Sequence, residues 1–69
     1  MIATYKVDGM TCGHCAHAVT EEVSAVPGVS DVQVTLEGGT MVVTSEQPIA
    51  LPSIVGAVAE AGDYTVVPA

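Results

Sequence analysis

The sequence predicts an α+β domain in which two helices cover one face of a four-stranded antiparallel sheet. Two patterns carry this prediction: stretches in which apolar residues alternate with polar ones, and two longer stretches in which apolar residues recur every three or four positions. These stretches follow one another in the order strand, helix, strand, strand, helix, strand. Such a doubled βαβ unit closes into a ferredoxin-like sandwich.

The beginning of the chain predicts a strand followed by a helix. Tyr5 and Val7 alternate with polar residues over positions 2–8, which is typical of a strand with one buried face. Over positions 13–26 the spacing changes to that of one helix face, formed by Cys15, Val19, Val23 and Val26. Pro27-Gly28 then ends the predicted helix.

A hairpin is predicted next. Positions 29–36 and 40–45 alternate, and Glu37-Gly38-Gly39 supplies a tight turn between them. The apolar faces of the two strands should consist of Val32, Val34 and Leu36 in the first and Met41 and Val43 in the second.

The remaining residues predict a second helix and a last strand. The helix has Pro52 in its first turn and Gly62 at its end, where each residue is favoured. Its buried stripe should consist of Leu51, Ile54, Val55 and Val58. A short strand over positions 64–67 completes the domain, because Pro68 cannot donate to a further backbone pair.

The length and composition restrict the function. Sixty-nine residues make one domain, which we assign to residues 1–69, and its core must be aliphatic because the chain has no Trp and no Phe. A pocket for an organic cofactor or a buried substrate needs roughly 300–1,000 Å³. Such a pocket is hard to build from so few elements without giving up most of the interior. We therefore predict a binding protein and not an enzyme.

The charge balance is acidic. Lys6 is the single Lys or Arg against eight Asp and Glu residues, which gives a formal net charge of −7. Nucleic acid and anionic membranes are poor partners for such a surface, whereas a basic protein surface is a good one. For any single carboxylate, solubility alone is an equally good reason for its presence.

The sequence also indicates where the protein works. No apolar stretch approaches the roughly 20 residues of a membrane span, and the amino terminus lacks an export signal. Two cysteines at close spacing do not suggest the disulfide framework of a small secreted domain. We therefore expect a soluble protein of the reducing cytoplasm, without insertion into a membrane.

The motif Gly9-Met10-Thr11-Cys12-Gly13-His14-Cys15 contains both cysteines and lies between the first predicted strand and helix. Cys15 should fall in the first turn of the helix, where unpaired amide groups favour a thiolate, and Cys12 in a loop that can bend toward it. A pair of thiolates suits a soft monovalent ion, above all Cu(I). Zinc normally takes four protein ligands, or three and a water.

Other residues near the motif have two interpretations each. His14 could be a third ligand or influence the charge of the cysteines, or it could be an exposed spacer, and His17 most simply serves the polar face of the helix. Met10 offers a soft sulfur but is better interpreted as a filler of core space. Tyr64 could cover the thiols or simply end the core.

Together the cysteine motif, the helix after it, Pro27-Gly28-Val29 and a second helix ending at Gly62 resemble the heavy-metal-associated domain over nearly the whole chain. In its brevity the chain is similar to bacterial CopZ-type copper chaperones. The resemblance implies Cu(I) held by Cys12 and Cys15 on an exposed loop with Met10 buried beneath it. It also implies delivery to the metal-binding domain of a copper-exporting P-type ATPase.

Two positions bear on this resemblance. Thr11 stands where zinc- and cadmium-handling relatives tend to carry an acidic residue, which favours copper. Bacterial members often read Gly-Tyr after the second helix, whereas this chain reads Gly62-Asp63-Tyr64. Either Asp63 is an insertion, or Tyr64 is displaced from the metal loop.

Three alternatives remain. A thiol–disulfide oxidoreductase also places Cys-x-x-Cys at a helix start, but this chain lacks an aromatic residue before the pair and is short for such a domain. An excised amino-terminal metal-binding domain of a copper ATPase would have the same sequence features, as would a mercury-binding relative. We further expect Glu21 and Glu22 to dock against a basic acceptor, and exposed thiolates to permit a copper-bridged homodimer.

Overall fold

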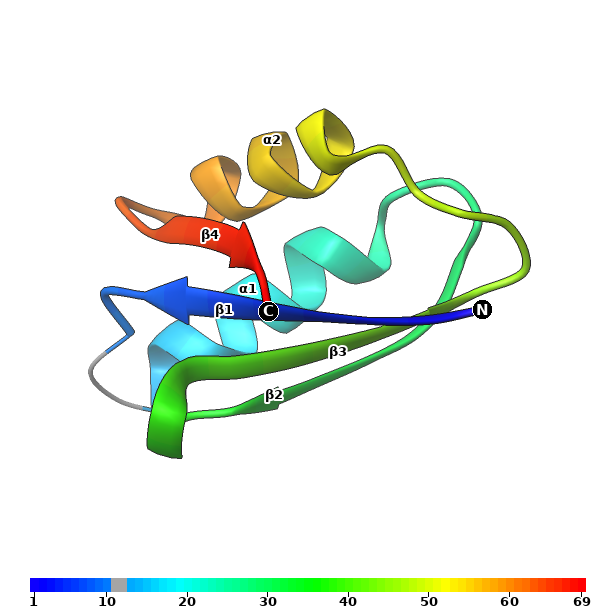
Figure 1. The fold of residues 1–69 in the computed structure, drawn as a ribbon. Helices are drawn as coiled ribbons and strands as arrows, with labels where there is room; N and C mark the ends of the chain where they lie inside the picture. Colours follow the sequence, from blue (N-terminus) through cyan, green and yellow to red (C-terminus); the bar gives the residue numbers. More distant parts are fainter. Residues whose placement is uncertain (11–12) are drawn as a thin grey trace.

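The computed structural model of the protein describes residues 1–10 and 13–69. Its elements are, in chain order, β1 (Ile2–Asp8), α1 (Gly13–Ser24), β2 (Val29–Thr35), the 3₁₀ turn η1 (Glu37–Gly39), β3 (Thr40–Ser45), α2 (Leu51–Ala61) and β4 (Thr65–Pro68). Figure 1 shows both helices on one side of the sheet. The predicted βαββαβ order is confirmed.

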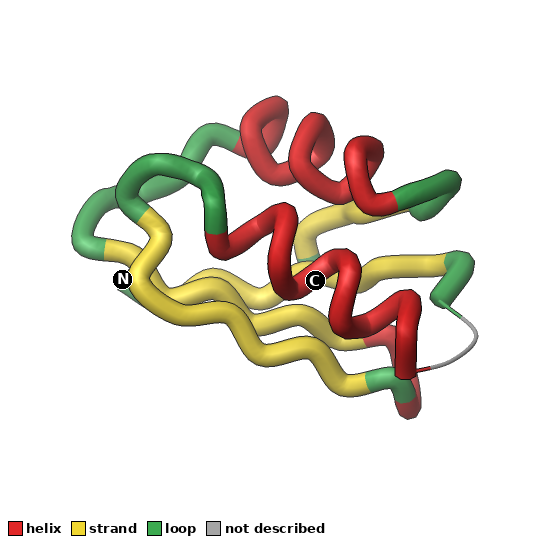
Figure 2. The backbone as a smooth tube through the Cα atoms, turned by 180° about the vertical axis from the view of Figure 1, so that it is seen from behind, coloured by secondary structure: helices red, strands yellow, loops and turns green. Residues whose placement is uncertain are grey.

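The sheet has the strand order β2-β3-β1-β4, with antiparallel pairing between neighbours. The centre of the sheet is the pair β1 and β3, in which Tyr5 lies opposite Met41. Seen from behind, α1 and α2 run across the same face of the sheet (Figure 2). This is the ferredoxin-like arrangement that the sequence predicts.

The core lies between the sheet and the two helices. Its side chains come from all four strands and both helices, and the largest fully buried ones are Met41, Ile54, Val7, Val19, Val23, Val43 and Val58. Tyr5 is the one aromatic residue of this buried cluster in the described part of the chain. Each buried aliphatic side chain contributes about 1.5–3 kcal/mol relative to an exposed one. An aliphatic core therefore holds the domain together, as the composition predicts.

The buried stripe of α2 is narrower than predicted. Ile54 and Val58 are fully buried, but Leu51 is 38% exposed and Val55 is 42% exposed. Successive residues of a helix are rotated by about 100°, so Val55 turns away from the sheet when Ile54 faces it. Leu51 is the first residue of the helix, where the covering from neighbouring elements is incomplete.

Several element ends also differ from the prediction. The helix α1 ends at Ser24 and not at Val26, β2 ends at Thr35, and β4 covers Thr65–Pro68 in place of 64–67. Pro68 can belong to β4 because this strand lies at the edge of the sheet, where a missing amide hydrogen breaks no second ladder.

The turn between β2 and β3 is a 3₁₀ turn over Glu37–Gly39. Gly39 has φ +63°, and a Cβ there would collide with the carbonyl oxygen of Val7, so this position requires glycine. Leu36 is 36% exposed just before the turn and does not join the core, contrary to the alternation. The strand had already ended at Thr35, so the period of two no longer fixes the direction of the Leu36 side chain.

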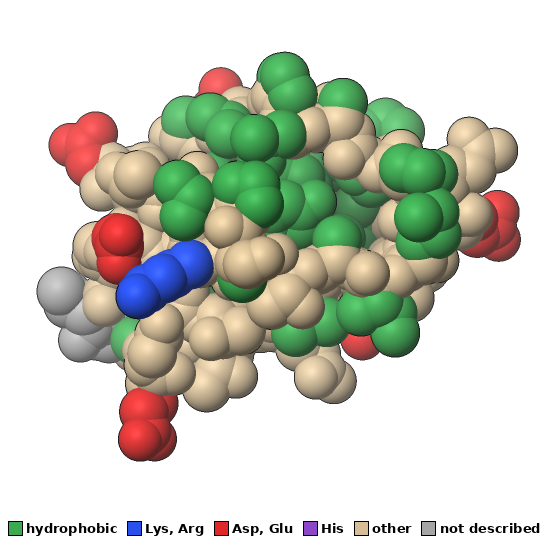
Figure 3. Space-filling model, in the orientation of Figure 1, with side chains coloured by type: hydrophobic (Ala, Val, Ile, Leu, Met, Phe, Trp, Pro, Cys, Tyr) green, Lys and Arg blue, Asp and Glu red, His purple; other side chains and the backbone are tan. Residues whose placement is uncertain are grey.

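Charged groups are spread over the surface. On the face shown in Figure 3, acidic side chains lie around the rim, and the single Lys or Arg is Lys6. Lys6 is exposed on β1 between the buried residues Tyr5 and Val7, so it points to the sheet face that the helices do not cover. As described, neither α1 nor α2 is long and apolar enough to cross a membrane.

Candidate metal centre

Cys15 is the third residue of α1, which begins at Gly13. The first amide groups of a helix have no partner within it, and together with the helix dipole they favour negative charge on a nearby sulfur. The first turn of α1 contains no acidic residue, so no carboxylate of this turn competes for those amides. The placement is therefore suited to a thiolate.

The Cys15 side chain is half-buried. It lies four positions before Val19 and eight before Val23, both of which are fully buried. These spacings put all three residues on the same helix face, which packs on the sheet. The sulfur thus lies at the end of the core stripe and not on the solvent side of α1, as the sequence predicts.

Thr11 and Cys12 lie outside the described residues. The convergence of the Cys12 and Cys15 sulfurs on one ion therefore stays a prediction. Within residues 1–10 and 13–69, no group of three or more His, Cys, Asp and Glu side chains gathers that could hold a metal ion. The described residues thus supply no ready-made cluster of the kind that a closed zinc site needs.

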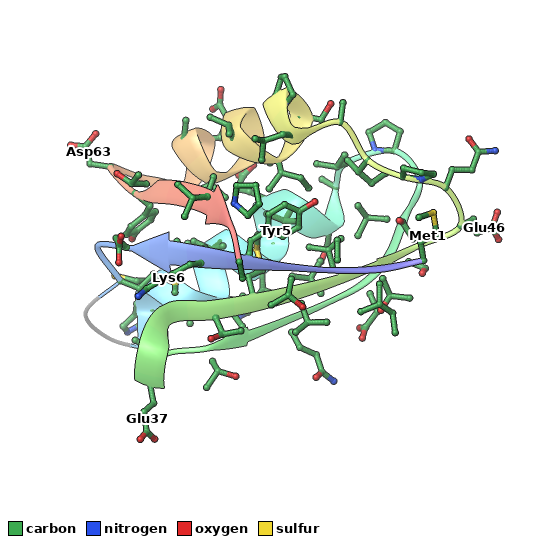
Figure 4. All side chains as sticks on the ribbon, viewed as in Figure 1. Met1, Tyr5, Lys6, Glu37, Glu46 and Asp63 are labelled. Carbon is green, nitrogen blue, oxygen red and sulfur yellow. The ribbon has the colours of Figure 1, made fainter. Side chains whose placement is uncertain are left out.

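The end of β1 lies beside the turn between α2 and β4. Gly9 has φ +104°, and a Cβ there would lie 3.1 Å from the carbonyl oxygen of Asp63 and 3.2 Å from Cδ1 of Tyr64. Figure 4 labels Asp63 at the end of the molecule where β1 ends and α1 begins. The turn after α2 is therefore a neighbour of the cysteine motif, as the topology predicts.

Tyr64 is packed between two glycines. A Cβ at Gly62 would lie 2.9 Å from Cε2 of the Tyr64 ring, and Gly62 has φ +155°. The amide of Tyr64 also donates to the carbonyl oxygen of Gly62 at 2.9 Å. The half-buried Tyr64 therefore lies against Gly9, at the start of the cysteine motif. Sequence reasoning had identified Tyr64 but not the two glycines that accommodate its ring.

Met10 is half-buried and packs against the core. This is the contact expected of a methionine that fills space beneath a loop. Its packing anchors the motif to the domain immediately before the part that is not described.

The two histidines lie on the outside of α1. His14 is exposed, and His17 has a side chain that is 73% exposed. The Nε2 atom of His17 lies 2.9 Å from Oε1 of Glu21, one helical turn away. The predicted role of His17 on the polar face of the helix is confirmed by this pair. The exposed position of His14 is compatible with both interpretations given to it.

Glu21 and Glu22 face different surroundings although they are adjacent. Glu21 is exposed and pairs with His17, whereas Glu22 is half-buried and lines a groove between α1 and α2. Successive helix residues diverge by about 100°, which explains the difference. The structure thus divides the expected docking pair between two parts of the surface.

Comparison with known proteins gives the family. The model of the heavy-metal-associated domain matches residues 4–63. The copper chaperone CopZ of Staphylococcus saprophyticus subsp. saprophyticus is 35% identical over 60 residues, which cover 86% of this chain and 88% of that protein. A solved structure of a CopZ metallochaperone is 31% identical and superimposes with a TM-score of 0.86. The superposition covers 97% of this chain and 100% of that chain.

The fold also occurs in a larger setting. A copper binding domain from HMA7, a P-type ATPase, superimposes with a TM-score of 0.87 over 99% of this chain and 92% of that one. Its sequence is 22% identical, so this likeness shows a shared fold alone. The family match covers most of the described fold and includes both cysteines and the helix that begins between them. The chain belongs to the heavy-metal-associated domain family.

Proposed function

We propose that this protein is a Cu(I) chaperone, which binds the ion with Cys12 and Cys15 and delivers it to the metal-binding domain of a copper-exporting P-type ATPase. The observation that carries the proposal is the position of Cys15, half-buried in the first turn of α1 at one end of the domain. The kinship with CopZ copper chaperones supports copper as the cargo. The activity is binding and delivery, not catalysis.

The chemistry of the cargo fits the two available thiols. Cu(I) is a soft ion that prefers thiolate sulfur, and the sequence contains one pair of cysteines and no other. Each sulfur must lose its proton to bind, and the amide groups at the start of α1 favour the resulting negative charge on Cys15. We place the protein in the cytoplasm, because a pair of cysteines is kept reduced there.

Delivery proceeds by exchange of ligands. A thiolate of the acceptor adds to the two-coordinate ion, one cysteine of the chaperone then leaves and takes up a proton, and a second exchange completes the transfer. Copper remains Cu(I) throughout, so no oxidant or reductant is consumed. A two-ligand site leaves room for the incoming sulfur, which makes tight binding compatible with fast release.

A competition experiment tests the metal site. The reduced wild type should hold one Cu(I) per chain against a Cu(I) chelator, and Cys12→Ser, Cys15→Ser and the double variant should lose the ion. The matched control is His17→Ala, which removes an exposed nitrogen already paired with Glu21 and should leave the affinity unchanged. Retention of Cu(I) by the double variant would show that the site lies elsewhere. Parallel titrations with Zn(II) and Hg(II) distinguish a copper protein from a mercury-binding relative.

An alternative is that this chain is the amino-terminal metal-binding domain of a copper ATPase. A copper binding domain of a P-type ATPase shares this fold. The neighbouring genes and the length of the protein that the gene encodes distinguish these two possibilities. At high copper loading, thiolates of two chains could share ions in a bridged homodimer, which sedimentation at increasing copper-to-protein ratio would reveal. An assay for disulfide reduction, expected to be negative, tests the oxidoreductase alternative.

A further inference from the structure

A groove of about 440 Å³ lies between the carboxyl-terminal part of α1 and the outer side of α2. Its apolar lining comes from small side chains, among them Ala25, Val26 and Ala57, and a carboxylate lies on each side, Glu22 from α1 and Glu60 from α2. Figure 2 shows the two helices on the side of the molecule away from the sheet.

Gly56 contributes backbone and no side chain to the lining of this groove. It lies inside α2 and lines the groove, and a Cβ built on it meets no atom within 4 Å. Its φ is not positive, so the backbone does not require glycine there. A glycine inside a helix lowers helix stability. The groove at this position is therefore open enough for an alanine, and only a large side chain would fill it.

The charges around the groove select its occupant. Glu22 of α1 and Glu60 of α2 both line the groove, and the chain as a whole carries a formal net charge of −7. Lys6, the single Lys or Arg, points to the opposite face of the sheet. A second copy of this acidic chain, or any polyanion, would be repelled by such a groove. A cationic side chain with an aliphatic stem fits both parts of the lining, because the stem can lie on the apolar floor while the charged head reaches the carboxylates.

We propose that the groove between α1 and α2 is the docking site for a segment of a partner protein that carries Lys or Arg. This inference rests on the proposed function, in which the partner is the copper acceptor. Glu22 lies seven positions after Cys15, which corresponds to about 10 Å along the helix. A partner held in the groove would thus leave Cys15 accessible for exchange of the ion.

An NMR titration of the reduced, metal-free 69-residue chain tests the proposal. The probe is the basic peptide acetyl-Ala-Lys-Ala-Ala-Arg-Ala-amide, and its counterpart with Gln in place of Lys and Arg is the control. The basic peptide should shift the amide signals of Glu22, Val26, Gly56 and Glu60, and the Gln peptide should not. Glu22→Gln and Glu60→Gln should each weaken binding about two- to fivefold, as expected for an exposed ion pair.

Substitutions at Gly56 give the sharper comparison. Gly56→Trp should fill the groove and weaken binding at least about tenfold, whereas Gly56→Ala should bind within about twofold of the wild type, because a methyl group occupies little of the space. If Gly56→Trp does not fold, Ser53→Arg replaces it, since Ser53 is exposed and lines the same groove. Its added positive charge should weaken peptide binding about two- to fivefold, as removal of one carboxylate does.

Three results would overturn the proposal. The first is absence of binding up to about 5 mM peptide, the range in which millimolar affinity would be seen. The second is a set of shifts spread equally over acidic residues that do not line the groove, such as Asp31 and Glu46. The third is unchanged binding by Gly56→Trp, or by Ser53→Arg where that variant replaces it. The Cu(I) affinity of each variant is measured alongside and should equal that of the wild type. If the wild type itself does not bind Cu(I), the proposed function is wrong. The conclusion that the groove binds a basic segment is not affected by that result.

Discussion

Tyr64 connects the turn after α2 to the start of the cysteine motif. Its ring lies against Gly9 on one side and Gly62 on the other, so each glycine supplies space that any side chain would fill. The position of the ring depends on both the path of the α2–β4 turn and the end of β1. For this reason the sequence alone could not decide between an inserted Asp63 and a displaced Tyr64.

Substitution of Gly9 tests this contact. We expect Gly9→Ala to lower the free energy of unfolding by about 1–3 kcal/mol, because φ is +104° and the new Cβ would lie 3.1 Å from a backbone oxygen that cannot easily move. Urea unfolding followed by circular dichroism measures the change. The control is Gly13→Ala, since Gly13 has nothing within 4 Å of its Cβ position and no positive φ. Equal stability of the two variants would show that the Gly9 position is not strained by a side chain.

The cysteine motif was predictable at the level of single residues. Cys15 falls in the first turn of α1 because the strand pattern ends before it and the helical spacing starts with it. The pairing of His17 with Glu21 also follows from spacing alone, since positions four apart are neighbours on a helix. The groove did not follow, because it depends on how α1 and α2 approach one another.

At the scale of elements, α2 shows where periodicity succeeds and where it fails. The period of 3.6 identifies Ile54 and Val58 correctly, but it cannot tell how wide a stripe the sheet will cover. Val55 and Leu51 are apolar and remain largely exposed for that reason. The ends of α1, β2 and β4 differ from the predicted ends by one or two residues. Local turn geometry, which periodicity does not describe, decides these ends.

Gly56 lies on the exposed face of α2, where a glycine lowers the stability of the helix. We expect Gly56→Ala to raise the free energy of unfolding by about 0.5–1 kcal/mol, because alanine restricts the unfolded chain and its methyl group enters open space. Ala59→Gly, the reverse change at another exposed position of the same helix, should lower it by a similar amount. Chemical denaturation of the two variants under identical conditions measures both effects. A decrease for Gly56→Ala would mean that the glycine has a role within the fold.

At the scale of the whole molecule, the core is complete without metal. In the described part of the chain the buried cluster consists of aliphatic residues and Tyr5, and Cys15 is not among them. We therefore expect the reduced, metal-free protein to be folded, with a helical circular dichroism spectrum and cooperative unfolding in urea. This differs from zinc fingers, in which metal binding supplies the folding energy. A random-coil spectrum that becomes ordered only with Cu(I) would contradict the expectation.

Copper should nevertheless raise the stability of the folded state. An ion that binds the native protein and not the unfolded chain stabilises it by RT ln(1 + [L]/Kd), so the effect grows with free Cu(I). The double variant Cys12→Ser, Cys15→Ser should show no such increase. The comparison of thermal unfolding midpoints with and without copper separates binding at the motif from adventitious binding elsewhere.

The negative charge of the molecule should influence the rate of copper transfer to the acceptor domain. Long-range attraction between a chain of net charge −7 and a basic partner accelerates their encounter, and it is screened over about 10 Å at 0.1 M ionic strength. Copper transfer should therefore slow as salt rises, whereas the Cu(I) affinity of the isolated protein, set by two sulfur ligands, should barely change.

The double variant Glu21→Lys, Glu22→Lys should transfer more slowly and lose most of the salt dependence. Its control is Asp31→Lys, Glu46→Lys, which changes the net charge equally, from −7 to −3, outside α1. Asp31 lies in β2 opposite Thr44, and Glu46 follows the end of β3. Equal slowing in both variants would assign the effect to net charge, and rates indifferent to salt and to Glu21 and Glu22 would exclude docking through α1 while leaving the metal site intact.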